Sequence, residues 1–315
     1  KTTEDNMRVL FMGTPDFAVP SLQVLIDQRH EICGVFTQPD KPKGRGYKLQ
    51  PPPVKELALQ NGLTVYQPPT LRDEAIQEEI VRLQPDLIVV VAYGKMLPLK
   101  VLNTPKLGCI NVHGSLLPKY RGAAPIQWAV LNGDSVTGVT TMFMAEGMDS
   151  GDILLTAETE IGPEETAGEL FSRLKDLGAE LLAETLKRLE QGKLTRIPQE
   201  EAAATFAPML KKEMSIVDWN QPAQRVHDQI RGLNPWPGAV AVLDRKRLKL
   251  LSSKVLTYSG EPGTVVSQEG ELVVFCGEGA IQITELQTDK GKRMGGKEYL
   301  LGHPLSKESI FTSWI

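Results

Sequence analysis

The chain has 315 residues, about twice the length of a typical single domain, and this length predicts two domains. Hydrophobic residues make up 41% and charged residues 23%, which is typical of globular proteins and excludes disordered and collagen-like classes. The net charge of -4 does not by itself favour nucleic-acid binding, although an acidic protein can still carry a basic face.

The cysteines and the apolar runs exclude further classes. Cys33, Cys109 and Cys276 are scattered and form no CxxC motif, so we expect neither a disulfide scaffold nor a metal site. The longest apolar run, residues 87–93, is far shorter than the ~20 residues of a membrane helix. No signal-peptide pattern opens the chain, and we therefore expect a cytoplasmic protein without a membrane span.

Strand-like runs alternate with amphipathic stretches through the first part of the chain, after a polar head at 1–6 that we expect to be disordered. Residues 86–92 are continuously apolar, as expected of a central parallel strand buried on both faces. The alternation predicts an α/β fold with a doubly wound, mostly parallel, Rossmann-like sheet. The expected strands are 8–12, 32–37, 64–66, 86–92, 108–112, 138–144 and 152–156, and the expected helices are 17–26, 54–60, 73–83 and 167–189.

Residues 38–53 interrupt this alternation with a segment rich in Pro, Gly and Lys. Its five prolines cannot lie in the interior of a strand or a helix, so we expect a long basic loop. Long loops in compact domains are often functional. The basic side chains of this segment are those of Lys41, Lys43, Arg45 and Lys48.

The character of the sequence changes after residue 191. Residues 192–211 are polar and are expected to form a linker. Several short strands with glycine turns follow, which predicts a small, OB-like β-barrel at 212–315. A basic cluster lies in this part, and it is either a solvated surface or a phosphate-binding one. Its residues are Arg245, Lys246, Arg247 and Lys249.

Asn111 and His113 lie at the end of the predicted strand 108–112, and their spacing places both side chains on one side of the chain. The carboxyl end of a strand is where ligands bind in open α/β sheets. An amide and an imidazole there can hold a developing oxyanion and move a proton. Asp149 would emerge at the same edge if its strand is parallel, and its carboxylate could orient the imidazole. The alternatives are a structural strand end whose His bonds a carbonyl, and an Asp that only forms a turn.

Other catalytic patterns are missing from the sequence. There is no G-x-S-x-G elbow and no phosphate-binding or dinucleotide-binding glycine motif. Gly44 and Gly46 flank a single arginine, but no third glycine follows and they do not join a strand to a helix. The sequence therefore disfavours a nicotinamide dehydrogenase on a similar sheet.

Three segments together resemble the 10-formyltetrahydrofolate-dependent formyltransferases: 13–18 (GTPDFA), 111–118 (NVHGSLLP) and 147–152 (GMDSGD). Four others are similar to the methionyl-tRNA formyltransferase family within that superfamily: 37–46, 90–94, 120–127 and 234–238. The resemblance implies a catalytic domain at 7–191 and a C-terminal tRNA-binding domain at 212–315. It also implies an enzyme of translation initiation that acts as a monomer.

The resemblance implies that the methionyl α-amine of initiator tRNA attacks the formyl carbon of 10-formyltetrahydrofolate, which is consumed as the donor without a metal. Asn111 and protonated His113 would hold the oxyanion of the tetrahedral intermediate, and Asp149 would support the cationic His. Tyr93, Gly94, Ser115, Leu116, Leu117 and Pro118 match the folate-binding segments. The basic loop resembles the one that grips the acceptor stem of the tRNA, and the basic cluster of the barrel would add phosphate contacts.

Two other classes remain possible at this stage. A formyltransferase or hydrolase that acts on a small molecule would share Asn111, His113 and Asp149. It would not explain both the basic loop and the added β-domain. A non-catalytic RNA-binding module would need these three residues to be inert, and nothing in the sequence disrupts them.

Overall fold

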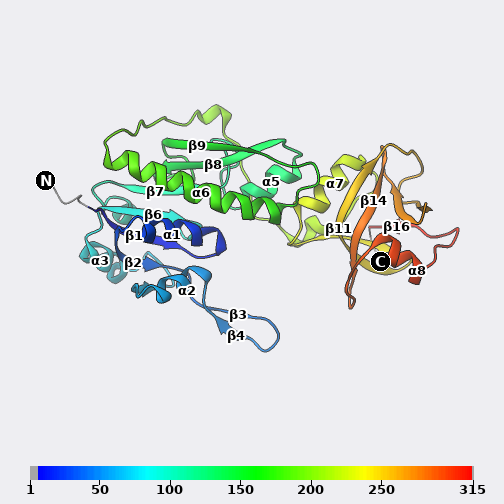
Figure 1. Ribbon diagram of the computed structural model, residues 1–315, viewed down its shortest axis with the longest axis horizontal. Coiled ribbons are helices and arrows are strands. Elements are labelled where there is room, and N and C mark those ends of the chain that lie inside the picture. The colour runs from blue at the N-terminus through cyan, green and yellow to red at the C-terminus, as the bar shows by residue number, and fades with distance from the viewer. Residues whose placement is uncertain (1–5, 314–315) are drawn as a thin grey trace. The chain divides into compact units, whose positions relative to one another are not determined.

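The computed structural model describes residues 6–313 and divides into two compact units (Figure 1). The N-terminal unit comprises the chain up to residue 122 together with 138–159 and 171–206. The C-terminal unit comprises 123–137, 160–170 and the chain from 207 onward. The expected disordered head lies outside the described residues apart from Asn6, which is exposed and donates a hydrogen bond to the carbonyl of Arg29.

The N-terminal unit is built on a seven-stranded sheet. Its strands are β1 (Arg8–Gly13), β2 (Glu31–Phe36), β5 (Val65–Tyr66), β6 (Leu87–Val91), β7 (Cys109–His113), β8 (Val136–Phe143) and β9 (Ile153–Glu160). Their order is β5-β2-β1-β6-β7-β8-β9. In this sheet the pairing of β7 with β8 is antiparallel and the pairings from β5 to β7 are parallel. The predicted mostly parallel sheet is confirmed.

Helices cover both faces of this sheet (Figure 1). They are α1 (Val19–Asp27), α2 (Pro53–Gln60), α3 (Glu74–Leu83), α4 (Leu99–Leu102) and α6 (Ala167–Glu190), with 3₁₀ turns at Asp16–Ala18 and Glu201–Ala203. On one face Ile88 and Val90 share a core with Ile80 of α3. On the other face, Gly178 lets α6 approach β7 and β8 closely, because a side chain there would crowd Val112.

The order of the strands reverses between β1 and β6, because the chain runs outward through β2 and β5 before it returns to β6. Such a reversal leaves a crevice at the carboxyl ends of the two strands, where open α/β sheets bind ligands. The loops that leave these strands are tied together there. The Thr14 hydroxyl and the Gln38 amide both donate to the carbonyl oxygen of Tyr93, each at 3.1 Å.

The prediction of an unpaired loop at 38–53 was wrong in one respect. Strands β3 (Lys41–Lys43) and β4 (Lys48–Gln50) form an antiparallel hairpin that projects from the sheet (Figure 1). Pro42 has no N–H to donate. It is tolerated because each strand of the hairpin has only one partner, so no third strand requires that donor. Gly44 and Gly46 adopt positive φ angles of 76° and 107° in the connecting turn.

Polar contacts hold the base of this hairpin. The ammonium of Lys55 lies 3.0 Å from a carboxylate oxygen of Asp40, and the Gln67 amide donates to Asp40 at 2.7 Å. The hydrogen bonds from Gln67 and then Lys55 lower the pKa of the Asp40 carboxyl. Tyr47 and Leu49 are exposed and do not anchor the hairpin, so it is held at its base by the contacts of Gln38 and Asp40.

The first part of the expected linker stays with the N-terminal unit. Ile197 forms a two-way backbone bridge with Ile153, at 2.8 and 2.9 Å. The N–H of Arg121 donates to the carbonyl of Thr205 at 2.9 Å. The segment up to residue 206 is therefore held along its length, although it contains little regular structure.

The C-terminal unit contains an antiparallel sheet of order β12-β13-β14-β11-β10-β16, with β15 paired to β14. Its two edges meet in a bridge between Thr264 and Ile310, which curls the sheet into the predicted small barrel. Leu250, Leu272 and Ile283 belong to its apolar core.

The strands are β10 (Ala239–Leu243), β11 (Lys246–Leu256), β12 (Val265–Gln268), β13 (Glu271–Phe275), β14 (Ala280–Thr288), β15 (Arg293–Gly295) and β16 (Phe311–Thr312). The helices are α5 (Pro125–Leu131), α7 (Ala223–Gly232) and α8 (Gly296–Gly302), with a 3₁₀ turn at Lys212–Ser215.

Within residues 6–313, none of the helices combines the length and the apolar character that a membrane crossing requires.

The barrel core predicts a contrast between two leucines. Leu250 on β11 is fully buried, whereas Leu301 on α8 is 86% exposed. We expect Leu250→Ala to lower the free energy of unfolding by about 2–5 kcal/mol, because it leaves a cavity. Leu301→Ala is the matched control and should change it by less than about 0.5 kcal/mol. Urea denaturation measures both, and equal effects would contradict the assigned core.

Candidate active site

Asn111 and His113 lie at the carboxyl end of β7, as the sequence predicts. The side-chain amide of Asn111 donates to the carbonyl oxygen of Val90 on β6 at 2.9 Å. This bond uses one amide hydrogen and leaves the other available to a ligand. His113 is only 7% exposed, so its ring is largely shielded from solvent.

The condition under which Asp149 was expected to emerge at this edge, a parallel strand before it, is not met, because β8 is antiparallel to β7. His113 lies opposite Thr140, and Phe143 at the end of β8 lies opposite Ile110 near the start of β7. The end of β8 therefore points away from the carboxyl edge of β7. The connection between β8 and β9 then brings Asp149 back to His113.

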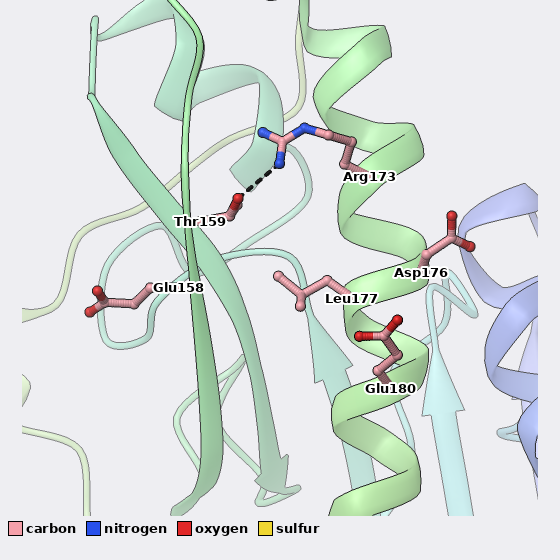
Figure 2. Close-up of a pocket in the computed structure, with 6 residues that line it drawn as sticks. All are labelled: Glu158, Thr159, Arg173, Asp176, Leu177 and Glu180. Atoms are coloured by element: carbon pink, nitrogen blue, oxygen red, sulfur yellow. Dashed lines mark hydrogen bonds between the residues drawn. The ribbon is translucent and has the colours of Figure 1, made fainter.

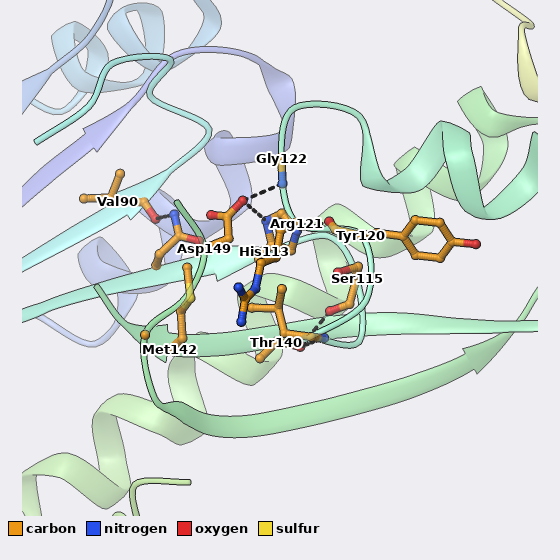
Figure 3. A network of polar contacts seen from close by, with 12 residues as sticks. Val90, His113, Ser115, Tyr120, Arg121, Gly122, Thr140, Met142 and Asp149 are labelled. Atoms are coloured by element: carbon orange, nitrogen blue, oxygen red, sulfur yellow. Dashed lines mark hydrogen bonds and ion pairs between the residues drawn. The ribbon is translucent and has the colours of Figure 1, made fainter. Parts of the chain in front are cut away.

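Asp149 and His113 meet across this connection (Figure 3). A carboxylate oxygen of Asp149 lies 3.7 Å from Nδ1 of His113 and accepts a hydrogen bond from the N–H of Gly122 at 2.7 Å. Asp149 has a φ angle of 50°, in the left-handed region that non-glycine residues rarely adopt. The backbone of the site is therefore strained at Asp149.

The second ring nitrogen of His113 is also engaged. Nε2 lies 2.8 Å from the carbonyl oxygen of Tyr120, which can only accept, so Nε2 carries a hydrogen (Figure 3). His113 thus contacts a main-chain carbonyl, as expected of a purely structural histidine, and also the carboxylate of Asp149, as expected of a catalytic one. Both ring nitrogens therefore have an oxygen acceptor nearby, the Asp149 carboxylate at Nδ1 and the Tyr120 carbonyl at Nε2.

The expected folate residues 115–118 form a tight turn after β7. The Ser115 hydroxyl donates to the carbonyl of Lys119 at 2.6 Å. Thr140 of β8 donates to the carbonyl of Ser115 at 2.6 Å and accepts from the N–H of Leu117 at 3.1 Å (Figure 3). Leu117 is buried, whereas Leu116 and Pro118 are half-buried.

The other expected folate residues, Tyr93 and Gly94, differ from each other in exposure. The Tyr93 ring is 2% exposed and packs in the core with Leu97 and Val101, and this burial raises the pKa of its phenol. Gly94 is exposed with a φ angle of 85°. Tyr93 is therefore buried as a whole residue, and of this pair only Gly94 is presented to a ligand.

The basic residues expected to contact tRNA are at the surface of two different units. All four on the hairpin are exposed: Lys41, Lys43, Arg45 and Lys48. In the barrel, Arg245, Lys246 and Arg247 are exposed, whereas Lys249 is half-buried. The stem of Lys249 packs over Gly238, where a Cβ would leave it no room.

Sequence reasoning missed the residues that hold the site together. The carbonyl of Tyr120, the N–H of Gly122 and the hydroxyl of Thr140 all bond to its functional segments. Tyr120 and Gly122 lie in the motif 120–127, which is the sequence feature that could have pointed to them. They act through main-chain groups, however, and every residue type carries these, so the sequence does not show which ones are used.

A separate surface pocket of about 340 Å³ lies between β9 and α6 (Figure 2). Glu158, Asp176 and Glu180 line it together with Arg173, whose guanidinium donates to Thr159 at 2.8 Å. Its excess of carboxylates disfavours anionic ligands. Among residues 6–313, no three His, Cys, Asp or Glu side chains are grouped so that they could hold a metal ion.

Family models match both parts of the chain. A model described as formyl transferase matches residues 6–186, and one described as formyl transferase, C-terminal domain, matches 209–304. A methionyl-tRNA formyltransferase of Trichlorobacter lovleyi is 50% identical over 300 residues, 95% of each chain. One of Acetivibrio thermocellus is 50% identical over 309 residues, 96% of this chain and 99% of the relative.

Solved structures share the fold at lower identity. An N-formyltransferase from Helicobacter canadensis, in complex with folinic acid and dTDP-3-aminofucose, has a TM-score of 0.70 at 18% identity, over 88% of this chain and 98% of that one. HypX from Aquifex aeolicus with tetrahydrofolic acid has a TM-score of 0.64 at 19% identity, over 98% of this chain and 51% of that one. The chain belongs to the formyl transferases and, within them, to the methionyl-tRNA formyltransferase family.

Thr140 generates a testable prediction about the turn 115–118. Thr140→Val keeps the shape of the side chain but removes its bonds to Ser115 and Leu117 in a fully buried site. We expect the free energy of unfolding to fall by about 1–3 kcal/mol, because buried polar groups lose their partner. Chemical denaturation measures the change, with Thr195→Val at an exposed position as the control. An equal effect of both variants would contradict the role of Thr140.

Proposed function

We propose that the site at the carboxyl end of β7 performs formyl transfer, with Asn111, His113 and Asp149 as its catalytic residues. The protein transfers the formyl group of 10-formyltetrahydrofolate to the α-amine of methionyl-initiator tRNA, giving N-formylmethionyl-tRNA for translation initiation. The observation that carries the assignment of residues is the 3.7 Å contact between His113 and Asp149.

Asn111 is suited to stabilise the oxygen of the formyl group. Negative charge develops on this oxygen when the amine attacks the formyl carbon. The free amide hydrogen of Asn111 can donate to it, and the bond to Val90 fixes the amide beforehand. A donor that is oriented before the reaction stabilises the transition state without reorganising during it.

His113 and Asp149 are suited to move the proton of the attacking amine. The attacking nitrogen becomes more acidic as it forms its new bond, and the leaving nitrogen of the donor must gain a proton. A protonated His113 also adds positive charge near the formyl oxygen, and Asp149 stabilises that charge at 3.7 Å. The low exposure of both groups strengthens this interaction relative to water.

The surroundings of the site fit a folate donor. A pterin is a flat ring with polar edges, and it needs apolar contact together with main-chain hydrogen bonds. Leu116 and Pro118 offer half-buried apolar surface, and the exposed backbone at Gly94 offers polar groups. We assign Ser115, Leu117 and Tyr93 a supporting role, since they hold the turn and the loop from the inside.

We propose that the exposed basic residues of the hairpin and of the barrel contact the tRNA. Lysine and arginine contacts with phosphates release counterions and supply affinity that depends on salt. The division into a catalytic domain at 7–191, a linker at 192–211 and a tRNA-binding domain at 212–315 is supported by the separate family models for the two parts. We propose a monomer that acts in the cytoplasm on its tRNA.

A comparison of acceptors tests the proposed function. The formyl-transfer rate is measured with 10-formyltetrahydrofolate and either methionyl-initiator tRNA, free methionine or glycinamide ribonucleotide. We expect efficient transfer only to the tRNA. Preferred transfer to a small acceptor would refute it.

Substitutions test the three catalytic residues. His113→Ala and Asp149→Ala should each lower kcat by ~10²–10⁴-fold, the usual contribution of an acid–base group. Asn111→Ala should cost ~10²–10³-fold if it stabilises an oxyanion. Asp27→Ala, at an exposed position on α1, is the control. Normal turnover in all three folded variants would remove these residues from the mechanism.

Arg45 tests the role of the hairpin. Arg45→Ala should lower kcat/KM for methionyl-tRNA by the equivalent of about 1–3 kcal/mol, because a planar guanidinium contact to RNA is lost. Folate binding, measured by fluorescence titration, should be unchanged because the proposed folate residues lie on other segments. Arg72→Ala, also exposed in the N-terminal unit, is the control. Full activity on tRNA, or loss of folate binding, would each contradict the assignment.

A further inference from the structure

We propose that Gln199 is a positioning residue that holds Asp149 in place for proton transfer, an inference that rests on the proposed roles of His113 and Asp149. The side-chain amide of Gln199 donates to the carbonyl oxygen of Asp149 at 2.7 Å and to that of Gly151 at 2.8 Å. Both hydrogens of the amide are thus used on the segment that carries the catalytic carboxylate. Gln199 lies in a stretch whose composition predicts only a linker.

The segment around Asp149 needs such support. Asp149 adopts the left-handed φ angle of 50°, and residues 145–148 before it are exposed. A strained residue keeps its conformation only when its surroundings over-determine it. At Gly151 the segment passes so close to the carbonyl oxygen of Phe143 that no side chain fits. The two bonds from Gln199 act on the main chain on either side of Ser150 and fix the direction of the Asp149 side chain.

The orientation of the Gln199 amide is set by Arg121. The Nε and Nη2 groups of Arg121 donate to Oε1 of Gln199 at 3.1 and 2.9 Å. A guanidinium has only donors, so the oxygen of the amide must face it and the nitrogen must face the carbonyls. Arg121 is 4% exposed and forms a two-pronged pair with Glu201 at 2.9 Å. The Arg121 hydrogen bond lowers the pKa of Glu201, which keeps this carboxylate charged.

The same network reaches both partners of the acid–base contact. Arg121 stands between Tyr120, whose carbonyl bonds His113, and Gly122, whose N–H bonds Asp149. The bonds of its guanidinium to Glu201 hold the segment 120–122 in place. Its bonds to Gln199 orient the amide that in turn holds the Asp149 segment. The 3.7 Å separation therefore depends on groups outside the His113–Asp149 pair itself.

Gln199→Glu is the discriminating variant. It keeps the size of the side chain and an oxygen toward Arg121, but it replaces the donor nitrogen with an oxygen that faces two carbonyl oxygens. We expect kcat to fall by about 10²-fold, the usual effect of a displacement near 1 Å, with KM for tRNA and folate little changed. Gln191→Glu adds the same charge at an exposed position and should behave as wild type. Gln199→Met removes the hydrogen bonds without adding charge and should show the same kcat loss.

A double-mutant cycle separates positioning from general stability. In the Asp149→Ala background there is no carboxylate to position, so Gln199→Glu should cost little further kcat. Equal losses in both backgrounds, or a fall in Tm or a rise in KM without a fall in kcat, would overturn the inference. The activity of the Asp149→Ala single variant is measured first. If this variant is fully active, the proposed catalytic roles themselves are overturned.

Discussion

The arrangement of the site depends on one constraint, the return of the chain from the end of β8 to the carboxyl end of β7. Because β8 is antiparallel, its last residue, Phe143, lies beside Ile110 near the amino end of β7, away from His113 at the carboxyl end. Asp149 reaches the histidine only through a connection with a left-handed residue and a close approach at Gly151. Hydrogen bonds from other segments must therefore compensate for the unfavourable backbone of this connection.

The functional groups differ in how they are held, and the difference matches their proposed chemistry. Asn111 belongs to a strand and bonds to the neighbouring strand, so its donor is fixed by the sheet itself. The His113–Asp149 contact joins a strand to an irregular segment, and its geometry depends on main-chain bonds from Tyr120 and Gly122. The hairpin is exposed, with only its base bonded through Gln38 and Asp40, which suits contacts to a large ligand.

Where sequence reasoning failed, non-local pairing was the cause. The hairpin at 41–50 was missed because its prolines and glycines argue against a strand, and only the pairing of Lys41 with Gln50 shows that one forms. The direction of β8 was left open for the same reason, since an apolar run does not indicate which way its strand runs. The buried strand β6 was predicted correctly, because a continuous apolar run needs cover on both faces.

The sequence alone determined the α/β class and the barrel, and it singled out Asn111 and His113 as candidate site residues at the end of a buried strand. Apolar periodicity and the spacing of Asn111 and His113 are local properties of the chain. The tertiary structure alone decided which partners orient these side chains: Gln199 lies 50 residues from Asp149 along the chain, and Gly122 lies 27 residues away. Hydrogen bonds between such distant residues follow no period, and several use the main chain, which every residue type carries. Only the fold determines which of these groups meet.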